Sequence, residues 1–267
     1  MTDKFKILNR IDNPNDLKKI SFDDLNILSD EIYQYIHEVI SEKGGHYSSP
    51  LGVVDLTIAL HYAYNTPIDK LVWDVGHQAY AHKILTNRKK DFKNIRQLNG
   101  ISGFLKIDES KYDAFGAGHS STSISAALGF AHARDMKNED NQVVAIIGDG
   151  ALTGGMAYEG LNNLGYHRTQ LTVILNDNSF SISKSVGALS KYLTLITTNK
   201  TYNRIRKKIW KISGKIPLFS KFIRFFLKKT EKAIKGSITP GGLFEDLGLR
   251  YIGPVDGHNL KDLIRAF

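Results

Sequence analysis

Two apolar runs constrain the fold of this chain more than any other feature of its sequence. VVAII (143–147) and LTVIL (171–175) are apolar throughout, without the polar alternation of a half-exposed strand. Unbroken apolar strands of this length are typical of parallel sheets that helices cover on both faces. The stretch GGMAYEGLNNLG between the two runs has the length and composition of a crossover helix. The two runs are therefore predicted to be parallel strands and sheet neighbours.

The rest of the chain alternates helical and strand patterns. Apolar residues at three- and four-residue spacing predict a helix over 14–42, and a largely buried helix is predicted over 51–65. Residues 71–76 are predicted to form a short strand. The stretch that starts with Gly118 and hydroxyl residues is predicted to continue as an Ala-rich helix. We therefore expect one α/β domain over residues 1–267, with a doubly wound, mainly parallel sheet in three α/β/α layers.

The net charge of +9 is concentrated in one segment. From Lys200 to Lys235 there are 13 Lys or Arg residues and one acid, a local charge of +12, so the remainder carries −3. This segment lies in a stretch of about 190–240 that interrupts the α/β pattern and is predicted to be a basic, mobile insert. Its aromatic residues leave three interpretations open: a connection that packs on another domain, which we favour, a membrane-surface helix, and a nucleic-acid surface. Because the remainder is not basic, we expect no nucleic-acid partner.

The composition excludes several classes of site. The chain has no cysteine, which excludes disulfides, thiol catalysis and cysteine–zinc sites. No apolar run reaches the roughly 18 residues of a membrane-spanning helix. The N-terminus has no apolar signal core and carries acidic residues, unlike a transit peptide. We therefore expect a cytoplasmic protein.

Each apolar run ends in small and oxygen-bearing residues. The sequence GDG (148–150) follows the first run and NDN (176–178) the second. Because the carboxyl ends of neighbouring parallel strands lie about 5 Å apart at one sheet edge, Asp149 and Asn178 are predicted to direct oxygens at one point. A carboxylate and an amide oxygen suit Mg²⁺, and glycines near a helix start leave room for phosphate. Either cluster alone would be an ordinary turn; the pair favours a metal–diphosphate site.

These motifs resemble those of the 1-deoxy-D-xylulose-5-phosphate synthase family. GDG with an Asn-rich end of the next strand is the signature of thiamine-diphosphate enzymes, and WDVGHQAYAHK and GAGHSSTSIS distinguish this family from the related transketolases and pyruvate dehydrogenases. The remaining matches cover nearly the whole chain apart from the basic insert: GGHYSSPLGVVDLTIALHY, GDGALTGGMAYEGLN, ILNDNSFSIS and PGGLFEDLGLRYIGPVDGHNL. The resemblance implies the thiamine-diphosphate-binding fold.

The resemblance also implies the residues that bind thiamine diphosphate and Mg²⁺. The implied Mg²⁺ ligands are Asp149, Asn178 and the main-chain carbonyl of Phe180. The implied cofactor-binding residues are His77, Gly118, His119, Ser120, Gly150, Ala151 and Asn178. For Ser120 and Ser121 the alternative role is plain N-capping of the helix that follows.

Two of the nine histidines are implied to be catalytic. His46 and His77 match family positions near the reacting carbon and the cofactor, where an imidazole can donate to an oxyanion or transfer a proton near neutral pH. We assign His61 to packing, and His132 and His167 to the solvent-exposed surface. A zinc site built from histidines has no HExxH pattern to support it.

The implied reaction is the decarboxylation of pyruvate and transfer of its two-carbon unit to D-glyceraldehyde 3-phosphate. In the family this is the first step of the non-mevalonate isoprenoid pathway, and its product also serves thiamine synthesis. Family members are more than twice as long and carry pyrimidine-binding and C-terminal domains, so this chain alone is expected to be inactive or nearly so. A homodimer, or a complex with a chain carrying those domains, is expected. The alternatives are one subunit of a split transketolase-like enzyme, or an inactive fragment that binds cofactor, partner or membrane.

Overall fold

The computed structural model describes residues 4–116, 118–177 and 242–267. The chain divides into two compact units, one of residues 1–182 with 255–267 and the other of residues 183–254. In the second unit the description covers 242–254, including helix α12 (Gly242–Asp246). The predicted basic insert at 190–240 lies outside the described residues.

The described part of the first unit contains three strands, nine α-helices of varied length and three short helical turns, η1 to η3. In chain order its elements are η1 (Leu8–Arg10), α1 (Pro14–Leu17), α2 (Asp24–Lys43), α3 (Ser48–Leu51), α4 (Val54–Ala63), β1 (Lys70–Trp73), α5 (Tyr80–Lys83), η2 (Ile84–Arg88), η3 (Asp91–Asn94), α6 (Ser123–Lys137), β2 (Val143–Gly148), α7 (Asp149–Leu152), α8 (Gly155–His167), β3 (Thr172–Asn176) and α13 (Leu260–Ala266).

The three strands form one parallel sheet in the order β1–β2–β3. The two apolar runs of the sequence are β2 and β3, and α8 is the crossover helix between them. Their register pairs Gly148 with Asn176, so the two strands end side by side. The prediction that these runs are adjacent parallel strands is confirmed.

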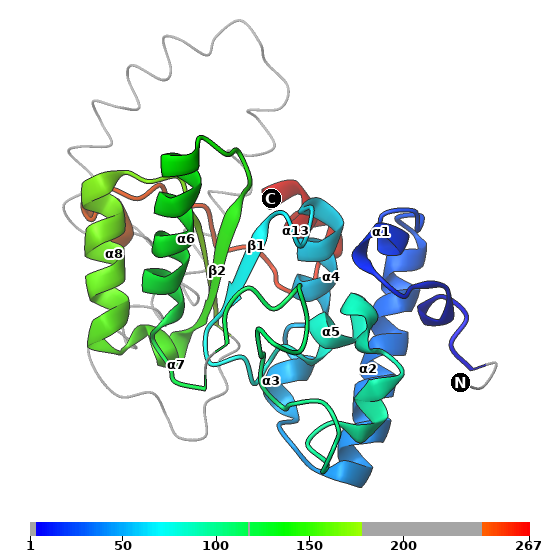
Figure 1. Ribbon diagram of the computed structural model, residues 1–267. Coiled ribbons are helices and arrows are strands. Elements are labelled where there is room, and N and C mark those ends of the chain that lie inside the picture. The colour runs from blue at the N-terminus through cyan, green and yellow to red at the C-terminus, as the bar shows by residue number, and fades with distance from the viewer. Residues whose placement is uncertain (1–3, 117, 178–241) are drawn as a thin grey trace, which may run out of the picture. The chain divides into compact units, whose positions relative to one another are not determined.

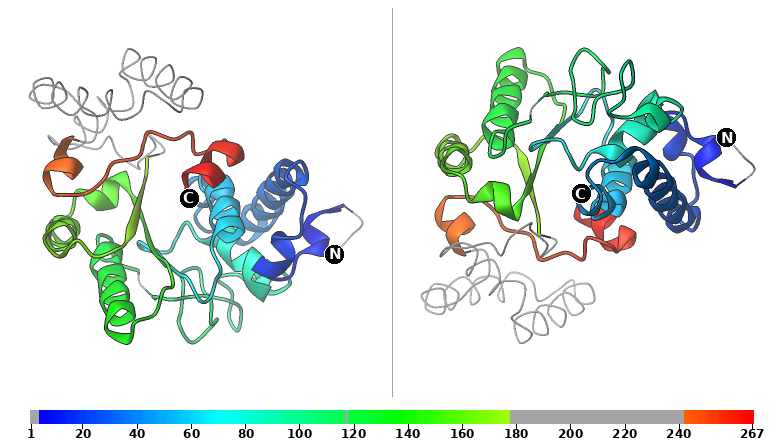
Figure 2. Two further views of the ribbon diagram at one scale, coloured as in Figure 1. Left: turned by 90° about the horizontal axis from the view of Figure 1, so that it is seen from above. Right: turned by 90° about the horizontal axis from the view of Figure 1, so that it is seen from below.

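Helices cover both faces of the sheet (Figure 1). On one face α6 packs against α8 and contacts β1 and β2. On the other face α2, α4 and α13 share a hydrophobic core with strand residues that include Trp73, Val144 and Ile146. The two views of Figure 2 show the same separation of the helices by the sheet. The predicted three-layer α/β/α arrangement is confirmed.

The predicted helix over 14–42 is divided in two. Pro14 begins α1, which Asn13 caps, but this helix ends at Leu17. The next helix begins at Asp24, whose carboxylate accepts a hydrogen bond from the Ser21 hydroxyl at 2.8 Å. The apolar spacing that motivated the prediction belongs to α2 alone, whereas the start signal belongs to α1. Similarly, the predicted helix over 51–65 is α4, preceded by the separate turn α3.

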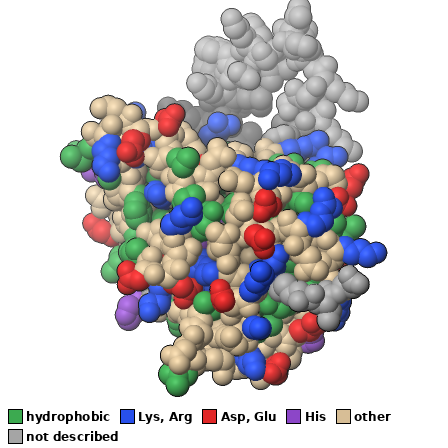
Figure 3. Space-filling view, turned by 45° about the vertical axis from the view of Figure 1, so that its right-hand side comes forward, with side chains coloured by type: hydrophobic (Ala, Val, Ile, Leu, Met, Phe, Trp, Pro, Cys, Tyr) green, Lys and Arg blue, Asp and Glu red, His purple; other side chains and the backbone are tan. Residues whose placement is uncertain are grey.

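The surface of the described residues carries mixed charge. On the face drawn in Figure 3, Lys and Arg side chains are interspersed with Asp and Glu side chains. This mixture agrees with the sequence count, which assigns the basicity to residues outside the described part. Within the described ranges, none of the helices combines the length and the apolar character needed to cross a membrane.

Candidate functional site

Two carboxylates lie at the carboxyl edge of the sheet. Asp149 follows β2 and Asp177 follows β3, each directly after the register pair that ends its strand. Burial raises the pKa of Asp149, and the Asp177 carboxylate raises it further. Negative charge is therefore disfavoured here unless a cation balances it, as a divalent ion would. Asn178 and Phe180 lie outside the described residues, so their roles as ligands stay predictions.

Asp177 is a second acid at this sheet edge, and the sequence pattern assigned it only to the turn NDN (176–178). Its electrostatic effect on Asp149 follows from the register of the two strands. The signal was present in the sequence: two acids that each follow an apolar strand of one crossover unit. Counting residues from the ends of both strands would have placed Asp177 opposite Asp149.

The glycines of this edge leave open space beside the backbone. Among the described residues, a Cβ added at Gly148, Gly150 or Gly118 would meet no atom within 4 Å. Packing within the described part of the chain therefore does not explain the glycines at these positions. Ala151 lies in α7 and is half-buried. These open backbone segments fit a ligand that approaches closely, as a phosphate group does.

The Ala-rich helix predicted from the sequence is α6. It begins at Ser123, after Gly118 and the hydroxyl residues, with Thr122 as an N-cap that makes no side-chain capping bond. Gly118, His119 and Ser120 are exposed residues of the preceding loop. N-capping by Ser120 or Ser121, the alternative role weighed for them, is therefore wrong.

A buried acid takes the place of the expected cap. Both carboxylate oxygens of Asp74 accept backbone hydrogen bonds, one from Ser121 N at 2.8 Å and the other from Ser123 N at 3.0 Å. Asp74 is only 1% exposed. Two of the N–H groups at the start of α6 are thus satisfied from inside the protein and are not available to an external anion.

The turn after β1 brings two histidines together. Gly76 has φ 89° and Val75 has φ 60°, and the Gly76 N–H donates to the Asp74 carbonyl at 2.6 Å. Positive φ is strained for a β-branched residue and is found mainly where the surrounding structure or a function requires it. This turn places the ring of His77 5.0 Å from that of His46, centroid to centroid, at 62°.

Both histidines of this pair have a lowered pKa. Burial is the main cause in each case; the Arg96 cation adds to it for His46, and the neighbouring imidazole adds to it for His77. The Asp74 carboxylate opposes the shift of His77. The Nδ1 atoms of both rings are buried and have no hydrogen-bond partner among the described residues. Two neutral imidazoles with a free ring nitrogen each are suited to donating or accepting a proton from a bound molecule.

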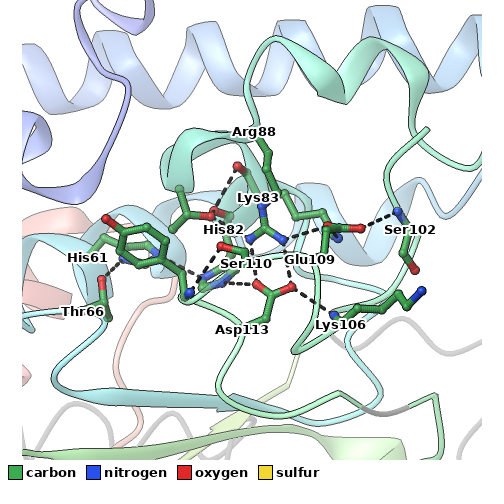
Figure 4. A network of polar contacts seen from close by, with 12 residues as sticks. His61, Thr66, His82, Lys83, Arg88, Ser102, Lys106, Glu109, Ser110 and Asp113 are labelled. Atoms are coloured by element: carbon green, nitrogen blue, oxygen red, sulfur yellow. Dashed lines mark hydrogen bonds and ion pairs between the residues drawn. The ribbon is translucent and has the colours of Figure 1, made fainter. Parts of the chain in front are cut away.

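A second pair of histidines lies in a buried polar network (Figure 4). His61 Nε2 is 3.0 Å from His82 Nδ1, His61 Nδ1 is 3.0 Å from the Thr66 hydroxyl, and His82 Nε2 is 3.2 Å from Asp113. Burial lowers the pKa of both rings, so His82 is neutral at pH 7. Because the Asp113 carboxylate can only accept, His82 Nε2 donates to it, and His82 Nδ1 accepts from His61 Nε2–H. Both rings are then neutral, and the assignment of His61 to packing agrees with its full burial.

Four charged side chains continue this network. Arg88 binds both oxygens of Asp113, at 2.7 and 2.8 Å, and also Glu109 at 2.8 Å; Lys83 pairs with Glu109 as well. The two carboxylates fix the loop around them, because Ser102 N donates to Glu109 and Lys106 N to Asp113. Although burial opposes it, hydrogen bonds from His82 and Arg88 hold the pKa of Asp113 well below its usual range.

The remaining assigned histidines lie between α6 and α8. His132 is half-buried and His167 is exposed, and their rings are 5.2 Å apart. The assignment to solvent therefore holds for His167 and only in part for His132.

The buried histidines predict a loss of stability in mild acid. Burial lowers the pKa of His61 well below 6.5, and that of His82 is also lowered. The unfolded chain then binds protons that the folded chain does not, so stability is complete above pH 6.5 and falls as the pH decreases. We expect the free energy of unfolding to fall between about pH 6.5 and about pH 5.5, by at most about 1.4 kcal/mol per pH unit for each of the two histidines. Urea unfolding followed by circular dichroism at several pH values measures it.

The control for this prediction is His61→Asn, which removes one of the two buried histidines of the network and leaves His46 and His77 in place. Its dependence on pH should be shallower than that of the wild type over the same interval. A wild-type unfolding midpoint that does not change over this interval would contradict the neutral assignment of the two rings.

The sequence matches one enzyme family over nearly its whole length. The family model described as 1-deoxy-D-xylulose-5-phosphate synthase matches residues 8–267. The enzyme of that name from Caldanaerobacter subterraneus is 52% identical over 97% of this chain and 42% of its own length. The one from Carboxydothermus hydrogenoformans is 53% identical over 98% of this chain and 42% of its own length. The chain thus spans less than half the length of these curated relatives.

Solved structures show the same fold at low sequence identity. A transketolase from Campylobacter jejuni superposes with a TM-score of 0.65, is 19% identical, and is matched over 92% of this chain and 35% of its own. A transketolase variant from Pichia stipitis gives a TM-score of 0.54 at 21% identity, over 64% of this chain and 30% of its own.

Proposed function

The chain belongs to the 1-deoxy-D-xylulose-5-phosphate synthase family, and we propose that it is the diphosphate- and metal-binding part of a thiamine-diphosphate-dependent transferase. The observation that carries this proposal is the carboxyl edge of β2 and β3. There, Asp149 has a raised pKa beside Asp177, and the neighbouring glycines leave the backbone open. Residues 1–267 would form one cofactor-binding domain with a basic insert.

The side chains of this edge fit the proposed cofactor. Asp149 would bind Mg²⁺, with Asn178 and the Phe180 carbonyl as further ligands. The backbone at Gly150 and Ala151 would contact the diphosphate, together with the exposed loop of Gly118, His119 and Ser120. This arrangement satisfies the charge of the diphosphate with N–H groups and a metal ion.

The proposed reaction takes pyruvate and D-glyceraldehyde 3-phosphate as substrates. Thiamine diphosphate supplies the nucleophilic carbon needed for decarboxylation and two-carbon transfer. The chain itself contributes His46 and His77, whose lowered pKa values keep them neutral at pH 7 and able to hold or move a proton. In this proposal the working assembly is a homodimer, or a complex with a chain that carries the other domains of the family.

Calorimetric titration with thiamine diphosphate tests this function directly. We expect binding to require Mg²⁺, because two acids at the sheet edge repel a diphosphate unless a cation lies between them. Thiamine monophosphate is the control, since it lacks the second phosphate. Equal affinity with and without Mg²⁺, or for both ligands, would contradict the proposed site.

A further inference from the structure

Asp74 connects the end of β1 to the start of α6. Its backbone is fixed by the sheet, since Asp74 N donates to Ile146 O at 2.8 Å. Its carboxylate binds Ser121 N and Ser123 N, 47 and 49 residues away in the chain. Hydrogen bonds between a buried carboxylate and backbone N–H groups are stronger than those between neutral groups. The position of Ser121 is therefore set by the sheet through a single side chain.

Ser121 continues the connection to α7. Its hydroxyl donates to the Ala151 carbonyl at 2.7 Å. The residue has φ 71°, a left-handed conformation that serine adopts only at some cost. Gly154 leaves the room that this contact needs, because a Cβ there would lie 2.1 Å from the Ser121 hydroxyl oxygen. A strained backbone, a partly buried hydrogen bond and a matching glycine thus meet at one point.

These bonds join three segments that the proposed site brings around one diphosphate. The first carries His77 after β1, the second is the loop 118–120, and the third is Gly150 with Ala151. We propose that Asp74 and Ser121 are positioning residues that hold these segments in register for the cofactor. The inference rests on the proposed function, because it assigns a purpose to geometry around that same site. Neither residue would contact the cofactor.

Preorganisation is the physical reason for such a device. Backbone N–H groups bind a phosphate well only when they already point at one place, since ordering them during binding costs free energy. Loop 118–120 is exposed and lies outside any helix, so it needs an anchor. The bonds of Ser121 to Asp74 and Ala151 provide one on each side.

Hydrogen exchange measured by mass spectrometry on the full chain tests the connection without any ligand. Ser121→Ala removes the hydroxyl and keeps the backbone N–H bond to Asp74. We expect faster exchange in the peptides that cover 118–123 and 149–154. The matched control is Ser123→Ala, because the Ser123 hydroxyl is buried without a partner among the described residues. Its exchange should equal that of the wild type.

Cofactor binding tests the positioning role. With Mg²⁺ present, we expect Ser121→Ala to bind thiamine diphosphate about fivefold more weakly, the effect of one lost hydrogen bond, and Asp74→Asn about tenfold more weakly. Gly154→Ala, which displaces the Ser121 hydroxyl, should reproduce the effect of Ser121→Ala. At saturating cofactor, the bound cofactor should still protect the amides of residues 149–154 in Ser121→Ala from hydrogen exchange. The amides of residues 118–123 should lose this protection, because the bond that holds their loop to Ala151 is gone.

Each result decides one question. If the wild type does not bind thiamine diphosphate with Mg²⁺, the proposed function fails, and ligand-free exchange still decides whether the connection exists. If the wild type binds but Ser121→Ala matches it in affinity and protection, the positioning role is overturned. The same conclusion follows if Ser123→Ala weakens binding as much as Ser121→Ala. Should Asp74→Asn fail to fold, the Ser121 and Gly154 variants decide alone.

Discussion

Asp149→Ala should abolish the Mg²⁺ dependence of thiamine diphosphate binding and weaken that binding about a hundredfold. Substituting groups that merely support a metal ligand costs about 10–100-fold in affinity, so the loss of a ligand should reach at least the upper end. The half-buried carboxylate at the end of β2 is the metal ligand in this proposal. Calorimetry of wild type and variant, each with and without Mg²⁺, measures the effect.

Asp177→Asn complements Asp149→Ala, because it tests the neighbouring charge separately from the metal ligand. It removes the neighbouring charge while leaving the carboxylate of Asp149 in place. In the absence of Mg²⁺ the pKa of Asp149 should then be closer to its ordinary value, because one of the two causes that raise it is gone.

If Asp149→Ala binds thiamine diphosphate as tightly as the wild type and with the same response to Mg²⁺, the metal lies elsewhere.

Arg88→Met should destabilise the fold by about 3–5 kcal/mol. The substitution leaves the carboxylate of buried Asp113 without its bidentate partner and removes one of the two cations at Glu109. Removing one member of a buried ion pair is costly because the remaining charge stays out of water. Urea unfolding at pH 7 measures the change in the free energy of unfolding.

Two further variants separate charge from geometry in this cluster. Arg88→Lys keeps the charge and loses the two-pronged contact, so its effect should be smaller. Combining Arg88→Met with Asp113→Asn removes both charges and should recover part of the loss. A loss below about 1 kcal/mol for Arg88→Met would mean that water reaches the cluster in solution.

The pairing and direction of β2 and β3 were predictable because the signals are local. An apolar run, a crossover helix and a second apolar run specify two parallel neighbours, and the structure has β2 and β3 in that arrangement. The position of Asp149 at the sheet edge follows from this unit alone. The other proposed Mg²⁺ ligands, Asn178 and Phe180, lie outside the described residues.

The contacts that hold the site together were not predictable in the same way. Asp74 binds the start of α6 from 47 residues away, and sequence spacing gives no register between β1 and that helix. His82 lies five residues from His77 in the sequence, yet its partner is His61 on another helix. Such pairings depend on how helices pack, and local periodicity carries no information about that.

The loop between Ser102 and Asp113 links the ion cluster to the candidate catalytic pair. The cluster carboxylates bind this loop through its backbone, and the loop carries Phe104, whose ring lies 5.8 Å from that of His46. Exchanging a buried ion cluster for apolar side chains often makes a protein more heat-resistant. Here the same substitutions would also free the loop that holds the Phe104 ring against the His46 imidazole. Engineering this protein for heat tolerance through the cluster would therefore also alter the packing around His46, a candidate proton-transfer group.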